Sequence, residues 1–154
     1  MSAAKPSGAS GFAKCKASDL KVGDARELVL VEKLTRTQIV MYAGASGDFN
    51  PIHHDEMFAS KAAGYPSVFA HGMLTMGLTG RLLTDWLGDG VLREYGVRFV
   101  KQVWPGDTLT ARGVVKSIDV RGDEGLVEIE IETRNQKGEP VVSGSAVAAL
   151  PARS

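Results

Sequence analysis

The segment from His71 to Leu87 constrains the fold most, because apolar residues cover most of the circumference of the helix that it predicts. Two apolar rows run along this helix, the first made of Leu74, Leu78, Leu82 and Trp86 and the second of Met73, Met76, Leu83 and Leu87. The small residues between the rows are Gly72, Gly77 and Gly80. The pattern is typical of a helix surrounded by protein, and Arg81 and Asp85 make it too polar to span a membrane. The glycines favour close approach by a neighbouring backbone, with an ordinary core helix as the alternative.

After this helix the pattern changes to alternating apolar and polar side chains, which is typical of strands. The clearest case is Val127 to Ile131, where apolar residues alternate strictly with Glu128 and Glu130. Further strands are predicted over 95–99, 109–115 and 141–150, with turns at 105–107, 121–125 and 135–138. A buried helix followed by four antiparallel strands predicts an α+β domain whose sheet wraps a long central helix.

The region before the helix contains shorter elements. A strand is predicted from about residue 24 through the alternating residues 28–34, and a helix over 38–43, capped by Thr35 or Thr37. Gly47 lies where a left-handed residue ends such a helix, and a short helix is expected over 55–62. Residues 1–17, rich in Ala, Ser, Gly and Lys, are expected to form a disordered tail, so that residues 18–151 make a single domain.

Composition limits the classes of function. The 154 residues carry 18 Lys plus Arg and 18 Asp plus Glu, and this balance argues against nucleic-acid binding. A net charge of zero favours self-association, since soluble monomers usually carry a net charge. Cys15 is the only cysteine, which excludes an intrachain disulfide and fits a reducing, cytoplasmic setting.

The candidate chemistry lies between residues 48 and 72, where all three histidines occur. Asp48 and His53 flank Pro51 in a segment that cannot be regular helix, so a turn can bring a carboxylate and an imidazole to one water molecule. Histidine suits proton transfer near neutral pH. Clusters of Asp, Asn, Pro and Gly more often form a turn and nothing else, so the spacing alone leaves both interpretations open.

Gly72, at the start of the buried helix, is a second candidate. Unpaired backbone N–H groups and the positive end of the helix dipole would stabilise a carbonyl oxygen that gains negative charge there. An ordinary helix start with a flexible glycine is the alternative. A metal site built from His53, His54, Asp55 and His71 is disfavoured, because adjacent histidines reach one ion only through a strained turn and no H-E-x-x-H spacing occurs.

The chain resembles the MaoC-like, R-specific enoyl-thioester hydratases and dehydratases of the hot-dog fold. The resemblance rests on the stretches Gly47-Asp48-Phe49-Asn50-Pro51-Ile52-His53 and Phe69-Ala70-His71-Gly72-Met73-Leu74, and a similar stretch runs from 98 to 107. The second stretch looks especially like the dehydratase subunits of mycobacterial-type fatty acid synthase II. The resemblance covers residues from about 19 to 150.

The resemblance implies a role for each residue of these motifs. Asp48 and His53 match the catalytic pair that activates the water, and Gly72 matches the amide of the oxyanion hole. Asn50 and Pro51 match residues that shape the loop holding the pair. We place His71, which precedes Gly72, with these site-shaping residues.

The implied reaction is the R-specific hydration of trans-2-enoyl thioesters, or the reverse dehydration of (R)-3-hydroxyacyl thioesters, in fatty acid metabolism. The resemblance implies neither a cofactor nor a metal. The implied partners are an acyl-CoA or acyl-carrier-protein thioester and a second hot-dog subunit, in a homodimer or a heterodimer, without nucleic acid and without membrane insertion. Arg98 or Lys101 could meet the phosphates of coenzyme A, although a solvated strand face explains both residues as well.

One position departs from some relatives, and two other functions remain as alternatives. Gly80 stands where those relatives carry a serine near the catalytic histidine, so the hydrogen-bond support of His53 is expected to differ. A hot-dog thioesterase would place a carboxylate on the central helix, where this chain has only Asp85 near the far end. A non-catalytic subunit of a heterodimeric dehydratase is the other alternative, and the intact pair of Asp48 and His53 argues against it.

Overall fold

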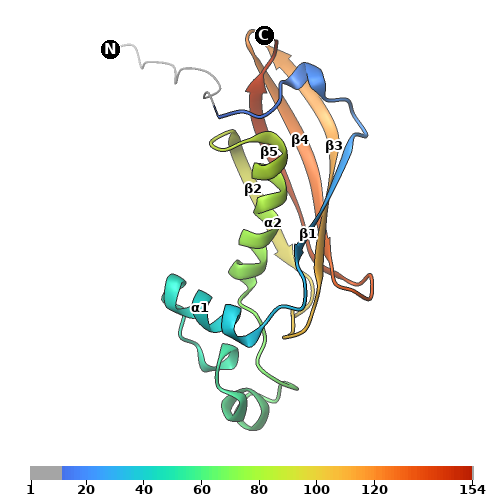
Figure 1. Ribbon diagram of the computed structural model, residues 1–154. Helices are drawn as coiled ribbons and strands as arrows, with labels where there is room; N and C mark the ends of the chain where they lie inside the picture. The colour runs from blue at the N-terminus through green and yellow to red at the C-terminus, as the bar shows by residue number, and fades with distance from the viewer. Residues whose placement is uncertain (1–11, 154) are drawn as a thin grey trace, which may run out of the picture.

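A computed structural model describes residues 12–153 of the chain (Figure 1). Within this range an antiparallel sheet of five strands has the order β1-β3-β4-β5-β2. The strands are β1 (Ala25–Val31), β2 (Leu92–Phe99), β3 (Leu109–Arg121), β4 (Glu124–Arg134) and β5 (Pro140–Pro151). Tight turns join β3 to β4 and β4 to β5 where the sequence predicts them, and β1 and β2 form the two edges.

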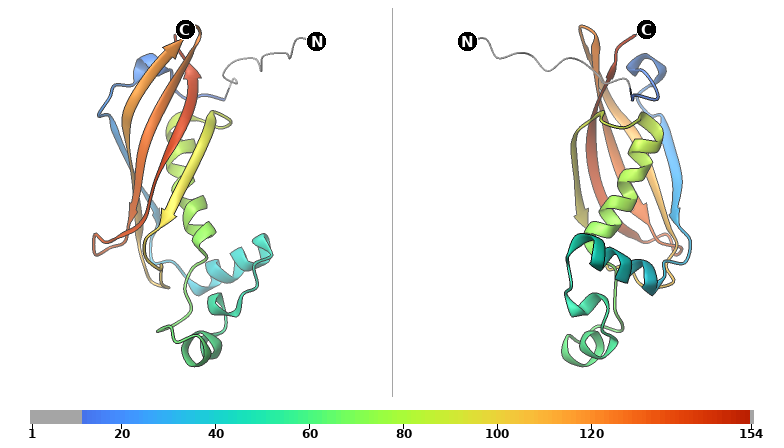
Figure 2. Two further views of the ribbon diagram at one scale, coloured as in Figure 1. Left: turned by 180° about the vertical axis from the view of Figure 1, so that it is seen from behind. Right: turned by 60° about the vertical axis from the view of Figure 1, so that its left-hand side comes forward.

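The long helix α2 (Gly72–Leu87) lies across one face of this sheet, as the two further views show (Figure 2). Its sheet-facing side buries Leu82, Leu83 and Leu87 against the strands, together with the hydroxyls of Thr75 and Thr79. The expected α+β hot-dog fold, an antiparallel sheet around a central helix, is therefore confirmed.

Protein does not surround α2 on all sides in the single chain, so that expectation is wrong. The side chain of Met73 is 56% exposed, and Gly77 is exposed with nothing within 4 Å of the position of an added Cβ. An added Cβ at Gly72 would lie 3.0 Å from the ring of Phe99. Close neighbours of the helix glycines are thus side chains rather than backbone, and one face of α2 is open.

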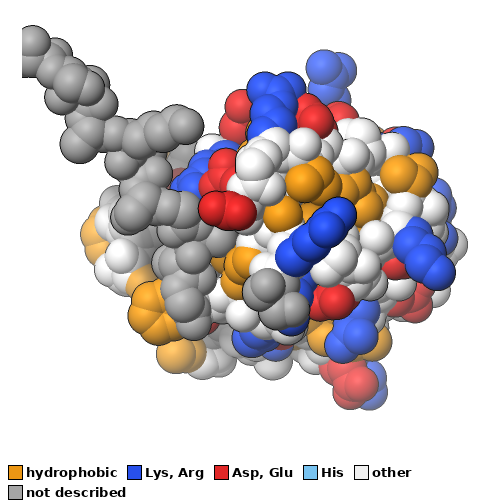
Figure 3. Space-filling view, turned by 90° about the horizontal axis from the view of Figure 1, so that it is seen from above, with side chains coloured by type: hydrophobic (Ala, Val, Ile, Leu, Met, Phe, Trp, Pro, Cys, Tyr) orange, Lys and Arg blue, Asp and Glu red, His pale blue; other side chains and the backbone are white. Residues whose placement is uncertain are grey.

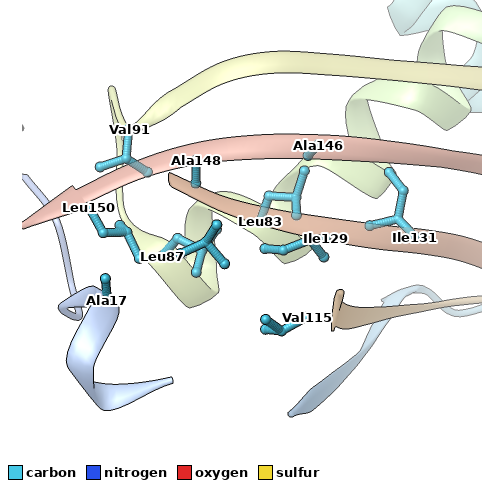
Figure 4. Close-up of a cluster of buried hydrophobic side chains, with 11 residues drawn as sticks. Ala17, Leu83, Leu87, Val91, Val115, Ile129, Ile131, Ala146, Ala148 and Leu150 are labelled. Atoms are coloured by element: carbon cyan, nitrogen blue, oxygen red, sulfur yellow. The ribbon is translucent and has the colours of Figure 1, made fainter. Parts of the chain in front are cut away.

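Apolar side chains of α2, of the sheet and of the segment before β1 pack together in one buried cluster (Figure 4). In the described part of the chain, the buried members of this cluster are Ala17, Leu83, Leu87, Val91, Val115, Val127, Ile129, Ile131, Ala146, Ala148 and Leu150. The strictly alternating residues of β4 point their apolar half into it, while Glu128 and Glu130 face outward. Burial of apolar surface in this core stabilises the folded state by about 25 cal/mol per Å² removed from water.

The segment before β1 is part of the folded domain from residue 13 onward. Ala13 forms an isolated bridge with Gly88, the Lys14 N–H donates to the Leu87 carbonyl at 2.8 Å, and Ala17 is only 2% exposed. Residues 1–11 of the expected tail lie outside the described residues. The domain therefore begins earlier than the boundary at residue 18 that composition suggested.

Helix α1 (Arg36–Ser46) and two short helices form a lobe beyond the start of α2. Thr35 and Gln38 make a capping box at the N-terminus of α1, and Gly47 ends the helix in the left-handed conformation with φ of 74°. The expected helix over 55–62 is present, and its last part, Phe58–Ala62, is a π-helix. A short 3-10 helix, Pro51–His53, connects the two.

Charges of both signs are interspersed on the surface at the end where β5 finishes (Figure 3). This distribution agrees with the net charge of zero. No helix within residues 12–153 has both the length and the apolar character that crossing a membrane requires.

Candidate active site

The loop that follows α1 turns sharply because its polar side chains bond to its own backbone. Asp48 accepts a hydrogen bond from the Asn50 N–H at 3.2 Å, and the Asn50 side chain accepts one from the Ile52 N–H, also at 3.2 Å. Pro51 then occupies the first turn of the 3-10 helix, where its missing N–H costs nothing. The loop thereby returns His53 to the neighbourhood of Asp48.

His53 is held as one defined tautomer. Its Nδ1 lies 2.7 Å from the backbone carbonyl of Phe69, and because a carbonyl only accepts, Nδ1 carries the proton and Nε2 is a free acceptor. Burial lowers the pKa of His53 below 6.5, and the bond to Phe69 opposes that effect in part. Nearby His71 lowers this pKa further, whereas the Asp48 carboxylate raises it. The neutral imidazole is therefore the form present near neutral pH.

His71 lies directly on His53. The two ring centroids are 3.8 Å apart with planes at 27°, and the Tyr42 ring makes an edge contact with His71 at 5.1 Å between centroids. The Nε2 of His71 donates to the backbone carbonyl of Asp48 at 3.0 Å. Its Nδ1 is buried without a hydrogen-bond partner among residues 12–153.

A carboxylate oxygen of Asp48 and one ring nitrogen each of His53 and His71 lie within 4.8 Å of one another. Two acceptors bridged by a single water lie about 4.5 Å apart when each hydrogen bond is about 2.8 Å long. Because an oxygen of Asp48 and a ring nitrogen of His53 lie no more than 4.8 Å apart, one water molecule can bridge them. Asp48 itself is exposed, so the water is accessible from solvent in the single chain.

The same three residues are poor ligands for a metal ion. The stacked rings of His53 and His71 are close to parallel, so their in-plane lone pairs run side by side instead of converging on one ion. One nitrogen of each ring is already committed to a backbone carbonyl, of Phe69 and of Asp48. The cluster suits a bridging water better than tetrahedral coordination.

Gly72 is the first residue of α2, immediately after His71. The N–H groups of Leu74 and Thr75 both donate to the His71 carbonyl, at 3.1 and 3.3 Å, whereas the N–H of Gly72 lies at the unpaired end of the helix. A pocket of about 280 Å³ adjoins it, lined by Phe69, Ala70, Gly72, Thr75, Phe99, Val100, Lys101, Gln102, Val103, Val141 and Val142. A ligand whose oxygen accepts a hydrogen bond from this amide would extend into a mostly apolar cavity.

The aromatic ring of Tyr95 occupies the space beside Gly80. An added Cβ at Gly80 would lie 3.4 Å from this ring, and the Tyr95 hydroxyl donates to the Met76 carbonyl at 2.6 Å. Burial raises the pKa of Tyr95 to about 12, so this hydroxyl stays protonated. Position 80 offers no side chain to His53, which is held through Nδ1 by the carbonyl of Phe69.

The structure brings together the predicted residues Asp48, His53, His71 and Gly72, with Asn50 and Pro51 shaping the turn. Sequence reasoning missed the carbonyl of Phe69 as the partner of His53 and the stack of two histidines. Backbone partners leave no signal in side-chain identity, so only the fold reveals the first of these. Lys101 lines the pocket but pairs with Glu139 at 2.7 Å, and Asp85 lies in the last turn of α2, away from the site.

This combination of a hot-dog fold, an aspartate–histidine pair and a helix N-terminus matches a known family of domains. The model of the MaoC like domain matches residues 18–137, and the chain belongs to this family.

Individual relatives agree with this assignment. The chain is 40% identical over 83 residues to 3-hydroxyacyl-thioester dehydratase Y of Mycobacterium tuberculosis, a match that covers 52% of this chain and 29% of that protein. Among solved structures, it is similar to R-hydratase PhaJ1 of Pseudomonas aeruginosa, with a TM-score of 0.78, 26% identity and coverage of 92% and 89% of the two chains. It is also similar to a chain of the ChsH1–ChsH2 complex of M. tuberculosis, with a TM-score of 0.68, 30% identity and coverage of 86% and 98%.

Proposed function

We propose that the chain is a hydro-lyase that adds water to trans-2-enoyl thioesters to give (R)-3-hydroxyacyl thioesters, and that also catalyses the reverse dehydration. The observation that carries this proposal is that a ring nitrogen of His53 and a carboxylate oxygen of Asp48 lie within 4.8 Å of each other, while the bond from Nδ1 to Phe69 leaves Nε2 as the acceptor of the neutral ring. The names of the relatives, a hydratase and a dehydratase among them, support the same reaction.

The proposed reaction uses each of these groups once. The thioester carbonyl accepts a hydrogen bond from the Gly72 N–H, which draws electron density from the β-carbon. The bridging water gives one proton to His53 Nε2 while its oxygen bonds to the β-carbon, and Asp48 accepts the second hydrogen of the water and so orients it. The electrons of the double bond move onto the thioester as an enolate. The proton taken up by the pair then passes to the α-carbon on the same face, which completes the addition.

The pocket beside Gly72 is the proposed site for the chain attached to the thioester. Its walls are mainly apolar, from Phe69, Phe99, Val103 and Val141, which suits an acyl chain. Lys101 at its edge pairs with Glu139, and both side chains are about half exposed, so this pair is weak and the ammonium is available to a carrier phosphate.

We further propose a second hot-dog subunit, either a copy of this chain or a relative. Strand β2 is an unpaired edge of the sheet, and edge strands in native proteins are usually covered. Close to it, Met73, Phe99 and Val100 expose 56%, 48% and 46% of their surface. The similarity to a chain of the ChsH1–ChsH2 complex supports a heteromeric as well as a homomeric pair. We retain the reducing cytoplasm as part of the proposal, on the basis of the single Cys15.

The test is the product formed from trans-2-enoyl-CoA substrates of increasing chain length in water enriched in ¹⁸O. We expect the label at C3 of an (R)-3-hydroxyacyl-CoA, with no release of free thiol. Release of coenzyme A without a hydroxyacyl product would instead identify a thioesterase. A purified chain that hydrates no substrate until a related subunit is added would identify a heterodimeric enzyme.

A further inference from the structure

The second buried histidine, His71, has no part in the reaction as written, yet its contacts link both members of the catalytic pair. It donates from Nε2 to the backbone carbonyl of Asp48 at 3.0 Å, and its ring covers one face of the His53 ring at 3.8 Å. It is 2% exposed and also holds the N-cap position directly before Gly72.

The hydrogen bonds assign opposite tautomers to the two stacked rings. His53 carries its proton on Nδ1, which donates to the backbone carbonyl of Phe69, whereas His71 must carry one on Nε2 to donate to the backbone carbonyl of Asp48. The remaining Nδ1 of His71 is a buried acceptor without a partner among residues 12–153. A buried polar atom without a partner costs free energy, and an apolar ring would pack here without that cost. The imidazole is therefore poorly explained by stability alone.

We propose that His71 is a positioning residue for the hydration reaction, which fixes Asp48 through its backbone carbonyl and covers one face of His53. The inference rests on the proposed function, because positioning has meaning only if Asp48 and His53 share the reacting water. A shift of a reacting group by about 1 Å can lower a rate about 100-fold, so loss of the hydrogen bond that holds the Asp48 backbone is expected to lower kcat.

The stack has a second effect on His53. A proton on His53 places a positive charge against the His71 ring, and two imidazoles in contact disfavour a state in which both are charged. Within residues 12–153, Asp48 and His54 act on His53 as nearby ionisable groups, and Tyr42 contacts the His71 ring. Among them, Asp48 raises the pKa of His53, whereas His71 and His54 lower it. Loss of the His71 imidazole is therefore expected to raise the pKa of His53.

Two substitutions separate the two contacts of His71. His71→Phe keeps a stacked ring but removes the donor to Asp48, whereas His71→Gln keeps an amide N–H near the position of Nε2 but removes the ring. We expect kcat to fall about 10-fold to 100-fold in His71→Phe with KM nearly unchanged, and to recover in part in His71→Gln. His54→Gln removes the exposed third imidazole, which in the described range bonds the Phe49 carbonyl, and serves as the matched control for kcat; because His54 also lowers the pKa of His53, it is not a control for the titration.

Titration of the imidazole signals by NMR supplies a readout that does not need turnover. The chain has only three histidines, so single substitutions assign every signal. We expect Nδ1–H on His53, Nε2–H on His71, and an upward move of the His53 pKa toward 6.5 in both His71 variants. If both variants fold with native melting temperatures yet keep the wild-type kcat and His53 titration, the proposal is wrong. The proposal is equally wrong if the variants lose melting temperature without any change in kcat, or if kcat of His71→Gln is no higher than kcat of His71→Phe. Absence of turnover in the wild type, both on its own and with a related subunit added, would refute the proposed reaction, whereas an unchanged His53 titration in the His71 variants would refute the contact between the two rings.

Discussion

Replacement of Gly72 by proline tests the oxyanion site with little disturbance to the fold. Gly72 is the first helical residue of α2, a position at which proline is favoured because its missing N–H has no partner in the helix. The preceding residue, His71, has ψ of 136°, the extended value that a following proline requires. Gly72→Pro therefore deletes the proposed donor while α2 is expected to remain intact.

The matched control is Gly72→Ala, which keeps the N–H. Each variant adds a Cβ that would lie 3.0 Å from the Phe99 ring, so each pushes the ring by a few tenths of an ångström. Phe99 is 48% exposed and can shift toward solvent. The steric change at Cβ is thus common to both variants, which differ at the backbone nitrogen, where proline carries its ring Cδ in place of the N–H hydrogen.

Loss of one oxyanion-hole donor lowers kcat about 100-fold to 1,000-fold, equivalent to about 3–4 kcal/mol of transition-state stabilisation. We expect Gly72→Ala to stay within about 10-fold of the wild type and Gly72→Pro to fall below it by the full factor of about 100 to 1,000. Steady-state hydration of a short trans-2-enoyl-CoA measures both, and melting temperatures confirm folding. Equal kcat values for the two folded variants would show that the Gly72 amide does not bind the thioester carbonyl.

Three further predictions concern pH, metal and packing. Because burial lowers the pKa of His53, we expect the acid limb of the kcat/KM profile to have its midpoint below pH 6.5, and a midpoint above pH 6.5 would contradict this. The free energy of unfolding should have its full value above pH 6.5 and decrease as the pH falls through the folded-state pKa, since the unfolded chain binds the proton more readily than the folded one. Dialysis against EDTA should leave kcat unchanged, because the stacked His53 and His71 rings do not converge on one ion, and recovery of lost activity by added Zn²⁺ would refute that argument. Gly125→Ala places a methyl 2.3 Å from the Ala17 Cβ, so we expect a loss of about 1–3 kcal/mol in urea unfolding, whereas Gly138→Ala at the opposite hairpin, strained only by its φ of 75°, should cost less.

The fold was predictable where the pattern is local. The alternation of Val127 to Ile131 with glutamates identifies β4 without reference to any other part of the chain, and Gly47 marks the end of α1. The pairing of β2 with β5, far from it in sequence, depends on which strands meet after α2 crosses the sheet. The packing of Ala17 against β4 is likewise a long-range contact that composition cannot reveal, and for that reason the domain boundary was placed too late.

In the candidate site, too, only the part formed by residues close together in the sequence was predictable. The side chains of Asp48 and His53 lie five positions apart, and the spacing with Pro51 between them predicts a turn that joins them. His71 reaches the pair from 18 positions further along, and the partner of His53 is a backbone carbonyl of Phe69. Neither the stack nor the tautomer of His53 follows from residue types, because both depend on how the lobe around α1 packs on the start of α2.

The activity of Asp48→Asn and His53→Ala on a trans-2-enoyl-CoA, measured in parallel with the wild type, tests the central claim most directly. Each change removes one of the two groups proposed to hold the water; Asp48 is exposed, whereas His53 is only 7% exposed, so melting temperatures check that both variants fold. Loss of a positioned acid or base lowers rates about 100-fold to 10,000-fold, and we predict a loss of this size for both variants, with the wild type forming the (R)-3-hydroxyacyl product. Wild-type rates in either folded variant would contradict the assignment of Asp48 and His53 as the pair that activates water.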